Sequence, residues 1–463
     1  MDKLFSHDAL SRRNFLTRFG TASAAICATQ AQTLSPAWAQ ASPAAGASAL
    51  EFGVRPDAGE DQSRAFQSMV NRAAQRGVAL FLPAGLYVIG QIALPSGLVM
   101  AGVRGQTQLV HSGAGYMLAA ANAKSIQLRD LSIHGGRRWT AERAHGLLDC
   151  RQVADLQIDG CTIAQAANDA LYLEQCSGTV RDSLLRDAAR FGVFSMQGRG
   201  MTIKDNQVER CGNGGIIVHR WEPGDDNTVI TGNRVSAIRA ANGGTGQWGN
   251  GINLFRTHNA IVANNMIHDC AFSAIRANAT QALTIAQNQC RDLGETAIYA
   301  EFGFQDALVN SNLIDGATNG ISITNFNDGG RSATVIGNIV RNLRLQGSYE
   351  PMAPGFGIGI AVEADTTVTG NVIENAEQYG INVGWGPNLR DCVVASNVIR
   401  QSHIGIGVSS AQGAGTALLS GNVINAQRGA IVAHAWNKPV SQDLAASNAA
   451  PPTNIIVRNN RVT

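Results

Sequence analysis

Short repeated segments of the chain carry the side chains best suited to acid–base chemistry. A segment consists of glycine or alanine, an aliphatic residue, any residue and a second aliphatic, and polar residues stand between and directly behind the two aliphatics. In consecutive segments these positions hold His219, Asn253, Arg276, Asn278, Tyr299 and Glu301. Histidine and tyrosine can transfer a proton, while arginine can hold a carboxylate through paired hydrogen bonds. The candidate catalytic residues are His219, Arg276, Tyr299 and Glu301.

These residue types suit the β-elimination of a uronate polymer. Arg276 would neutralise the substrate carboxylate, and Tyr299 or His219 would remove or return a proton. Glu301 would then orient the arginine. A second interpretation stays open, because polar side chains on a solvated sheet commonly include such residues, and Glu301 beside Arg276 would then be an ordinary surface ion pair.

Hydrolysis of a glycosidic bond would instead require two carboxyl groups about 5 to 9.5 Å apart. Glu174 and Glu301 lie five repeats apart, which is about 24 Å at the spacing of stacked strands. The remaining pairs are Glu295 with Glu301 and Asp169 with Glu174. The sequence therefore leaves elimination and hydrolysis both open.

Aromatic and polar residues around the same segments suit the binding of a sugar chain, because aromatic faces stack on apolar ring surfaces and guanidinium groups bind carboxylates. The candidate substrate-binding residues are Arg220, Trp221, Trp248, Asn253, Arg256, Asn278 and Trp385. No metal site and no cofactor are expected. His145, His403 and His434 belong to different repeats, and outward carboxylates do not cluster as Ca²⁺ would require.

A recurring asparagine shows which elements position these segments. It returns mostly every 23 to 27 residues and is followed two places on by an aliphatic residue. The recurring asparagines are Asn206, Asn233, Asn265, Asn288, Asn312, Asn338, Asn371, Asn397, Asn422 and Asn460. Clear copies of the segment begin at Gly215, Gly251, Gly320, Gly380 and Gly405, and weaker ones at Gly146, Ala170, Gly192, Ala274, Ala297, Gly357 and Ala430.

Each repeat thus holds two or three short strands, and a single repeat cannot bury its own apolar side. Stacking the repeats about 4.8 Å apart buries the aliphatics in one core and aligns the asparagines in a hydrogen-bonded ladder. The predicted fold is all-β: a right-handed, single-stranded parallel β-helix over residues 111–463. A capping module over residues 51–110 would precede it.

The two ends of such a stack need covers, because the first and last coils have unpaired strand edges. Residues 61–76 have Phe66, Met69, Val70 and Ala73 at helical spacing, with Gly77 as a stop signal, and predict a short N-terminal capping helix. At the other end, either the loop 435–453 or another subunit covers the last coil.

Insertions in the repeats occupy two turn positions and should project from one flank, where a solenoid usually binds its ligand. They are residues 239–250, 344–355, 219–228, 325–332 and 434–453. The seven cysteines behind Cys27 form no C-x-x-C pattern, and we expect buried thiols that act as small core residues.

The first 39 residues have the features of a twin-arginine export signal. Ser11-Arg12-Arg13-Asn14-Phe15-Leu16 precedes an alanine-rich stretch and the small-residue site Ala37-Trp38-Ala39. Cleavage there removes four of 36 basic and two of 34 acidic residues and leaves 32 of each. We expect residues 40–50 to be a linker and the mature chain to be periplasmic or secreted, without a nucleic-acid surface or a membrane span, and its oligomeric state stays open.

Three stretches resemble markers of the pectate-lyase superfamily of β-helices: Glu51-Phe52-Gly53-Val54-Arg55-Pro56-Asp57-Ala58-Gly59-Glu60-Asp61, Phe81-Leu82-Pro83-Ala84-Gly85-Leu86-Tyr87 and Ala101-Gly102-Val103-Arg104-Gly105. With the signal and the repeats, the whole chain resembles a family of twin-arginine-translocated repeat proteins. The resemblance implies carbohydrate or uronate chemistry on the outer face of the first parallel sheet. The N-T-D, G-H-G and R-I-K motifs of polygalacturonases and the D-P-H-E run of alginate epimerases are missing.

The resulting hypothesis is an exported protein that acts on polysaccharides, as a lyase or hydrolase of an acidic glycan. The alternative is a non-catalytic glycan-binding protein or scaffold of the cell envelope, because a fold does not determine an activity.

Overall fold

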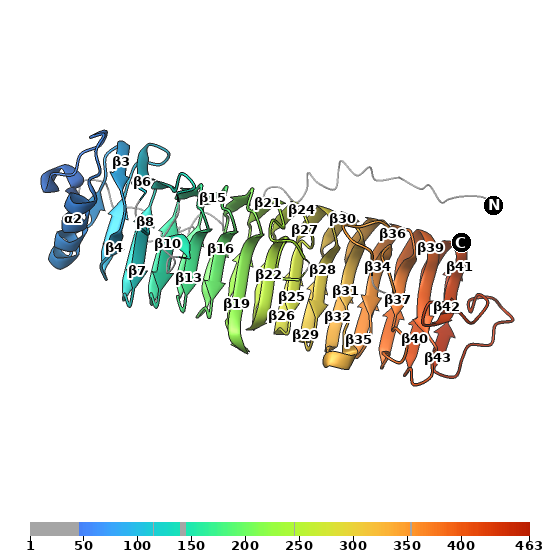
Figure 1. Cartoon of the computed structure of the whole chain (residues 1–463). Helices are drawn as coiled ribbons and strands as arrows, with labels where there is room; N and C mark the ends of the chain where they lie inside the picture. Colours follow the sequence, from blue (N-terminus) through green and yellow to red (C-terminus); the bar gives the residue numbers. More distant parts are fainter. Residues whose placement is uncertain (1–45, 114, 139–144, 245, 352–353) are drawn as a thin grey trace, which may run out of the picture. The chain divides into compact units, whose positions relative to one another are not determined.

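The computed structural model describes residues 46–113, 115–138, 145–244, 246–351 and 354–463, and residues 46–463 form one unit of the chain. The predicted export signal, residues 1–39, lies outside the described residues. Nearly all described elements are short parallel strands that follow one another in coils (Figure 1). Successive strands stack in three ladders, so the predicted parallel β-helix is confirmed.

The first ladder has 16 strands and begins with β1, so residues 47–50 of the predicted linker already belong to the fold. Its strands are β1 (Ala47–Ser48), β2 (Leu80–Phe81), β5 (Leu98–Ala101), β8 (Ser125–Arg129), β11 (Asp155–Asp159), β14 (Gly178–Arg181), β17 (Met201–Lys204), β20 (Val229–Thr231), β23 (Ile261–Ala263), β26 (Gln281–Ala286), β29 (Gln305–Asn310), β32 (Arg331–Ile336), β35 (Thr366–Thr369), β38 (Cys392–Ala395), β40 (Ala417–Ser420) and β43 (Ile455–Arg458).

The second ladder follows the recurring asparagines. Its strands are β3 (Gly85–Ile89), β6 (Thr107–His111), β9 (Ser132–His134), β12 (Thr162–Ala164), β15 (Leu184–Arg186), β18 (Gln207–Glu209), β21 (Arg234–Ile238), β24 (Met266–Cys270), β27 (Gln289–Leu293), β30 (Leu313–Ala317), β33 (Ile339–Leu343), β36 (Val372–Ala376), the first halves of β39 (Val398–Ser409) and β41 (Val423–Ala435), and β44 (Arg461–Val462).

The third ladder contains the glycine–aliphatic segments and therefore the candidate site. Its strands are β4 (Ile92–Leu94), β7 (Leu118–Ala121), β10 (Gly146–Arg151), β13 (Asp169–Glu174), β16 (Phe191–Met196), β19 (Gly214–Asp225), β22 (Asn250–His258), β25 (Ile275–Asn278), β28 (Thr296–Glu301), β31 (Asn319–Ile323), β34 (Ile358–Val362), β37 (Tyr379–Val383) and the second halves of β39 and β41.

The small first residue of each segment has a steric cause. A Cβ atom on Gly320 would lie 2.2 Å from Cγ1 of Val340 and 2.3 Å from the carbonyl oxygen of Gly359 in the next coil. The segment therefore passes too close to its neighbours for a larger side chain. The aliphatics behind it, such as Ile321 and Ile323, are buried in a core that continues through all the coils.

The asparagine ladder is confirmed from Asn206 to Asn460. Asn312 is typical: its backbone N–H and its Nδ2 both donate to Oδ1 of Asn338, at 2.9 and 3.0 Å. Its Nδ2 also donates to the carbonyl of Ile285 at 3.1 Å, and its Oδ1 accepts both groups of Asn288. Each such side chain thus uses all of its hydrogen-bonding capacity inside the protein.

We expect Asn312→Ala to lower the free energy of unfolding by about 2 to 3 kcal/mol, because it leaves buried groups of Asn288 and Ile285 without partners. Denaturant unfolding followed by circular dichroism measures this change. Asn242→Ala is the matched control, because Asn242 is exposed and its loss should change stability by less than about 0.5 kcal/mol. Equal stability of the two variants would contradict the structural role of the ladder.

The predicted buried thiols are confirmed: Cys150, Cys161, Cys176, Cys211, Cys270, Cys290 and Cys392 are free and buried. Burial raises the pKa of Cys290 to about 12, so the thiolate form is rare at neutral pH. These cysteines therefore act as small core residues.

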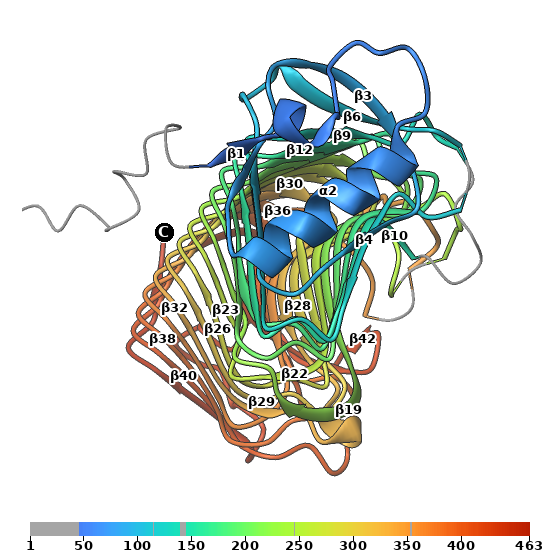
Figure 2. The ribbon, with the colours of Figure 1, turned by 90° about the vertical axis from the view of Figure 1, so that its left-hand side faces the viewer.

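The N-terminal cap is α2 (Ser63–Arg76), preceded by the one-turn helix η2 (Ala49–Phe52), and it lies across the first coils (Figure 2). It begins two residues later than predicted and ends at Gly77, whose φ of 64° is left-handed. The Phe66, Met69 and Val70 side chains of this helix are buried in the core of the first coils. The Gln67 side chain pairs with both backbone groups of Ala93, at 2.7 and 2.8 Å, and so closes the open edge of β4.

At the C-terminal end the chain itself covers the last strand of the third ladder, as the first of the two alternatives predicts, whereas β43 and β44 are the last described strands of the other two ladders. Residues 436–453 turn back along β41 and form β42 (Lys438–Pro439), which pairs antiparallel with it. The Asp443 carboxylate accepts the N–H groups of Ala430 and Ile431 at 2.8 and 3.1 Å. The last strand of the third ladder therefore has its outer edge hydrogen-bonded within the chain.

The remaining insertions border the third ladder at both ends of its strands. Residues 239–250 and 344–355 lead into β22 and β34. The insertion at 219–228 forms the extended end of β19, and the insertion at 325–332 follows β31. The loop 325–332 contains the short helix η3 (Phe326–Asp328). Within the part of the chain that the structure describes, no helix has the length and apolar character of a membrane span.

Candidate functional site

The strand register places the predicted polar residues in two adjacent rows on the outer face of the third ladder. Asn253, Arg276 and Tyr299 are paired in successive strands, and Phe255, Asn278 and Glu301 form the neighbouring row. His219 pairs with Phe255 and extends the second row by one strand. The sequence therefore places these residues in the correct order and orientation.

The sequence predicts an outer face that is open to solvent, but in the structure this face is covered. Only 4% of Asn253, 8% of Arg276 and 1% of Glu301 are exposed. Side chains from the insertions lie over this face: Trp248 stacks on Phe191 at 5.7 Å between ring centres, and the Tyr349 hydroxyl donates to Glu295 at 2.5 Å. The interpretation of Arg276 and Glu301 as a solvated surface ion pair is therefore wrong.

Arg276 is bound to two glutamates. Its Nε and Nη2 donate to Glu301 at 2.5 and 3.0 Å, and its Nη1 donates to Glu295 at 3.3 Å. The guanidinium fork is thus already paired with a carboxylate of the protein. The expected role of Arg276, paired binding of a substrate carboxylate, does not fit this geometry, whereas orientation of the arginine by Glu301 does.

The two proposed proton carriers are neutral groups at physiological pH. Burial is the main cause that raises the pKa of Tyr299 to about 12, and its ring lies 5.0 Å from the Arg276 guanidinium. Burial also lowers the pKa of His219 to about 4, and its Nε2 is hydrogen-bonded to Oδ1 of Asn253 at 3.1 Å. A base at neutral pH would therefore have to be the neutral imidazole rather than a tyrosinate.

Two clefts lie side by side on this face. The first, of about 390 Å³, we call the aromatic cleft. Its lining residues are Arg190, Phe191, Phe194, His219, Gly246, Gln247, Trp248, Asn253, Phe255, Arg276 and Asn278. Of the predicted binding residues, Trp248, Asn253 and Asn278 come together here.

The second, of about 300 Å³, we call the carboxylate cleft. Its lining includes Glu295, Tyr299, Tyr349, Glu363, Asn382 and Trp385. Arg276 joins the two clefts, because it lines the first and its Nη1 binds Glu295 in the second. Of the predicted residues, Tyr299 and Trp385 lie in the carboxylate cleft.

Glu363 is the residue that sequence reasoning missed. It directly follows β34, is 9% exposed, and its Oε2 accepts the N–H of Phe326 at 2.7 Å. Burial raises the pKa of Glu363 to about 7, although the backbone N–H groups of Phe326 and Asn325 oppose the shift. This carboxyl group is therefore partly protonated at neutral pH.

The sequence pattern gives the wrong register for this strand. It predicts a weak copy of the segment that begins at Gly357, which puts Gly359 and Ala361 outward. The structure pairs Ile321 with Ile360, so the true copy begins at Gly359 and puts Ala361 and Glu363 outward. The signal in the sequence is the small residue: Gly359 stacks between Gly320 and Gly380, and a Cβ atom on Gly359 would lie 2.3 Å from the carbonyl oxygen of Gly380.

Three predicted binding residues line neither cleft. Arg220 pairs with the buried Asp226 at 3.5 Å and donates to the carbonyl of Gly198. Arg256 donates to the carbonyl of Trp221, and nearly half of the Trp221 side chain is exposed. The Arg256 contact joins β22 to the extended end of β19, and the Arg220 contact with Gly198 joins this end to the residues behind β16, so both arginines have structural partners.

The two predicted carboxylate pairs lie in different parts of the structure. Glu295 and Glu301 both bind Arg276, on opposite sides of its guanidinium group. Asp169 and Glu174 stand at the two ends of β13, where Asp169 faces Arg190 and Glu174 accepts the hydroxyl of Tyr172. Only the first pair belongs to the cleft region.

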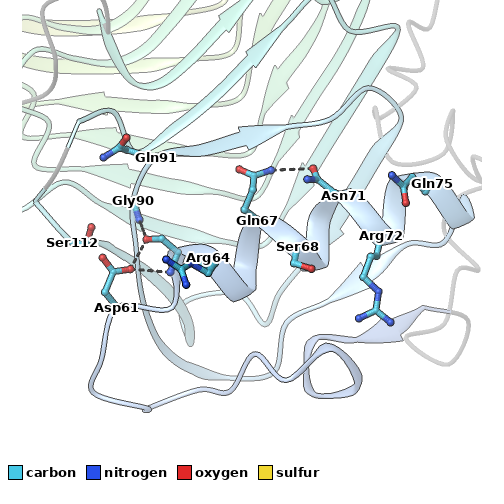
Figure 3. Close-up of a pocket in the computed structure, with 11 residues that line it drawn as sticks. Asp61, Arg64, Gln67, Ser68, Asn71, Arg72, Gln75, Gly90, Gln91 and Ser112 are labelled. Atoms are coloured by element: carbon cyan, nitrogen blue, oxygen red, sulfur yellow. Dashed lines mark hydrogen bonds between the residues drawn. The ribbon is translucent and has the colours of Figure 1, made fainter.

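A third and larger cavity, of about 790 Å³, lies beside the capping helix (Figure 3). Two of its polar side chains make hydrogen bonds that stabilise the fold: Gln67 binds the backbone of Ala93, and Ser63 accepts the N–H of Gly90 at 2.8 Å. Asp61 is its one acidic residue. It therefore offers no pair of carboxyl groups. Among the residues described, no group of three or more His, Cys, Asp or Glu side chains could hold a metal ion.

Three stacked ladders with a covered outer face define the protein as a parallel β-helix. The family described as the right handed beta helix region matches residues 106–235 and 223–340, which span 235 of the 463 residues, and the chain belongs to this family. The comparison with curated proteins gives no match.

Solved structures are similar in fold at low identity. Pre-mature gene product 12 of bacteriophage phi29 is 11% identical, with a TM-score of 0.52 over 90% of this chain and 72% of that chain. The mannuronan C-5 epimerase A-module of Azotobacter vinelandii is 14% identical, with a TM-score of 0.40 over 90% and 99%. The catalytic unit of an α-1,3-glucanase from Streptomyces thermodiastaticus is 11% identical, with a TM-score of 0.40 over 90% and 69%.

Proposed function

We propose that the protein hydrolyses a glycan in the carboxylate cleft. The observation that carries this proposal is that two glutamates, Glu295 and Glu363, line one cleft in opposite environments. Glu363 is buried, and no cation among the described residues contributes to its pKa, whereas Glu295 receives hydrogen bonds from Arg276 and Tyr349. Carboxyl groups whose surroundings differ in this way are the usual acid and base of glycoside hydrolysis. Glu295 precedes β28 and Glu363 follows β34, so the two side chains enter the cleft from opposite ends of the strands, and the proposal requires the wider spacing of about 6.5 to 9.5 Å at which a water molecule lies between the carboxyl groups.

In this mechanism Glu363 is the general acid. Its proton goes to the glycosidic oxygen as the bond to the anomeric carbon breaks. Glu295 carries the negative charge, stabilised by the donors of Arg276 and Tyr349, and takes a proton from the water molecule that attacks the anomeric carbon. Trp385 offers an aromatic face for a sugar ring in the same cleft.

The charges of the cleft favour a neutral glycan over the acidic glycan of the sequence-based hypothesis. The residues that line the carboxylate cleft include Glu295 and Glu363 and no lysine or arginine. A uronate would therefore meet like charge there. Elimination would also need a cation for the substrate carboxylate, and the Arg276 fork is bound to Glu301.

The test is incubation of the purified protein with neutral polysaccharides and polyuronides, followed through both new reducing ends and the ultraviolet absorbance of unsaturated uronates. Reducing ends from a neutral glycan alone are the expected result. Unsaturated product would contradict hydrolysis and restore the lyase hypothesis. Binding without either product would favour the alternative of a glycan-binding or envelope scaffold.

We further propose that residues 1–39 direct export of the folded protein by the twin-arginine route, in keeping with the resemblance to that family of repeat proteins. Seven free cysteines and a long parallel solenoid suit a chain that folds before export. Replacing Arg12 and Arg13 by lysine should leave the full-length protein inside the cell. Fractionation with immunoblotting measures this, and undiminished export of the variant would refute the proposal.

A further inference from the structure

Beside the carboxylate cleft lies a second site that hydrolysis itself does not use, the aromatic cleft. Its rings form a continuous series over successive strands: Phe194 contacts His219, and His219 contacts Phe255, both at 5.5 Å between ring centres. Trp248 lies on the other side, stacked on Phe191 with 20° between the ring planes. A cleft of about 390 Å³ lined by rings and a few amides has the size and composition of a ligand site.

The polar groups in this cleft are those that bind hydroxyl groups. Asn253 is fixed by its bond to His219 and by a bond from its Nδ2 to the carbonyl of Gly246 at 3.1 Å. Asn278 donates weakly to Glu301, at 3.4 Å. Burial keeps His219 uncharged, because it lowers the pKa of this residue to about 4. The two arginines of the lining are each paired with a carboxylate of the protein, Arg190 with Asp169 at 3.6 Å and Arg276 with Glu301 at 2.5 Å. The flat apolar faces and neutral amides that remain suit a sugar ring better than a charged ligand.

The two clefts lie along one line across the strands. The row that begins at His219 continues through Phe255, Asn278 and Glu301, and Glu363 is its sixth member, behind Val362. At the spacing of paired strands, Glu363 is five steps or about 24 Å from His219 and three steps or about 14 Å from Asn278, the last member of the row that lines the aromatic cleft. Glu363 therefore lies away from the aromatic cleft along the path of a chain that crosses the strands, whereas Glu295 borders this cleft through its bond to Arg276.

We propose that the aromatic cleft is a remote subsite that holds the same neutral glycan chain several sugar units from the bond that is cut. This inference rests on the proposed function. With Trp248 and Phe191 on one side of the carboxyl groups and Trp385 on the other, the chain is held at both sides of the cut. The protein then cleaves inside chains, and its affinity rises once an oligosaccharide is long enough to reach the aromatic cleft.

Isothermal titration calorimetry tests the inference with α- and β-linked gluco-oligosaccharides from disaccharide to octasaccharide, on the full protein carrying Glu363→Gln so that no probe is cut. The expected result is a step in affinity of about tenfold between short and long members of one series. Adding Trp248→Ala should remove that step. Trp221→Ala is the matched control, because this tryptophan is half-exposed and lines neither cleft, and the step should remain.

A step that survives Trp248→Ala, or a protein that binds all lengths equally or none, would overturn the remote subsite. A different outcome would refute the proposed hydrolysis. If the step is present and depends on Trp248 but the wild-type protein releases no reducing ends, the subsite stands as a glycan-binding site and the catalytic proposal is refuted. The folding of each variant is checked by its thermal transition.

Discussion

Glu363→Gln should reduce kcat for glycan hydrolysis by about 10² to 10⁴-fold, the usual contribution of a general acid, with little change in KM. Glutamine retains the size of the side chain and can still accept the N–H of Phe326, but it has no proton to give to the leaving oxygen. Because the pKa of Glu363 is about 7, the wild-type rate should fall as the pH rises through that value. Initial rates over a pH series measure both effects.

An aryl glycoside with an acidic leaving group provides a sharper readout, because its departure needs no proton. The Glu363→Gln variant should therefore recover much of its rate on such a substrate, which a variant with a damaged fold would not do. Glu350→Gln is the control: this exposed glutamate lies on the loop that carries Tyr349 but does not line the cleft. Equal losses on polysaccharide and aryl glycoside would show that Glu363 is not the acid.

Arg276→Met should lower the free energy of unfolding by about 3 to 5 kcal/mol at pH 8, the usual cost of removing one partner from a buried ion pair. The cause is that Glu295 and Glu301, 3% and 1% exposed, would remain buried as anions without their cation. Burial already raises the pKa of Glu301, and Arg276 opposes this rise. Without the arginine the Glu301 carboxyl group should take up a proton more readily as the pH falls.

The sign of the pH dependence follows from this uptake. A group whose pKa is higher in the folded than in the unfolded state favours folding at low pH and loses that contribution as the pH rises. The deficit of Arg276→Met should therefore be smaller at pH 5 than at pH 8 in denaturant unfolding. The control is the same variant with Glu295→Gln and Glu301→Gln added, which should regain stability at pH 8. A deficit that is independent of pH would contradict an electrostatic origin.

The periodic part of the fold could be predicted from sequence because one physical requirement repeats in every coil. The asparagine must meet its counterparts above and below, and the aliphatics must point into a common core, so both recur at the spacing of a coil. The capping helix could be found for a similar reason: Phe66, Met69 and Val70 have a period that only a helix places on one side.

The site could be predicted only where it obeys that period. Arg276, Tyr299 and Glu301 were placed correctly because their segments lack insertions nearby, whereas residues 344–355 obscured the start of the next segment and with it Glu363. The burial of the outer face of the third ladder could not be predicted from the sequence either. It comes from Trp248 and Tyr349, which lie on insertions, and no periodic pattern indicates how an insertion folds back onto a sheet.

The asparagine ladder also allows whole coils to be inserted into such a chain or deleted from it. Every ladder side chain donates to the following one and accepts from the preceding one in the same direction, so any two of them are interchangeable partners. Excising residues 313–338, from the position behind one asparagine through the next, would leave Asn312 facing Asn371 with the same donors and acceptors. Coils bounded by this residue are therefore modular: one can be gained or lost without creating an unpaired amide in the ladder.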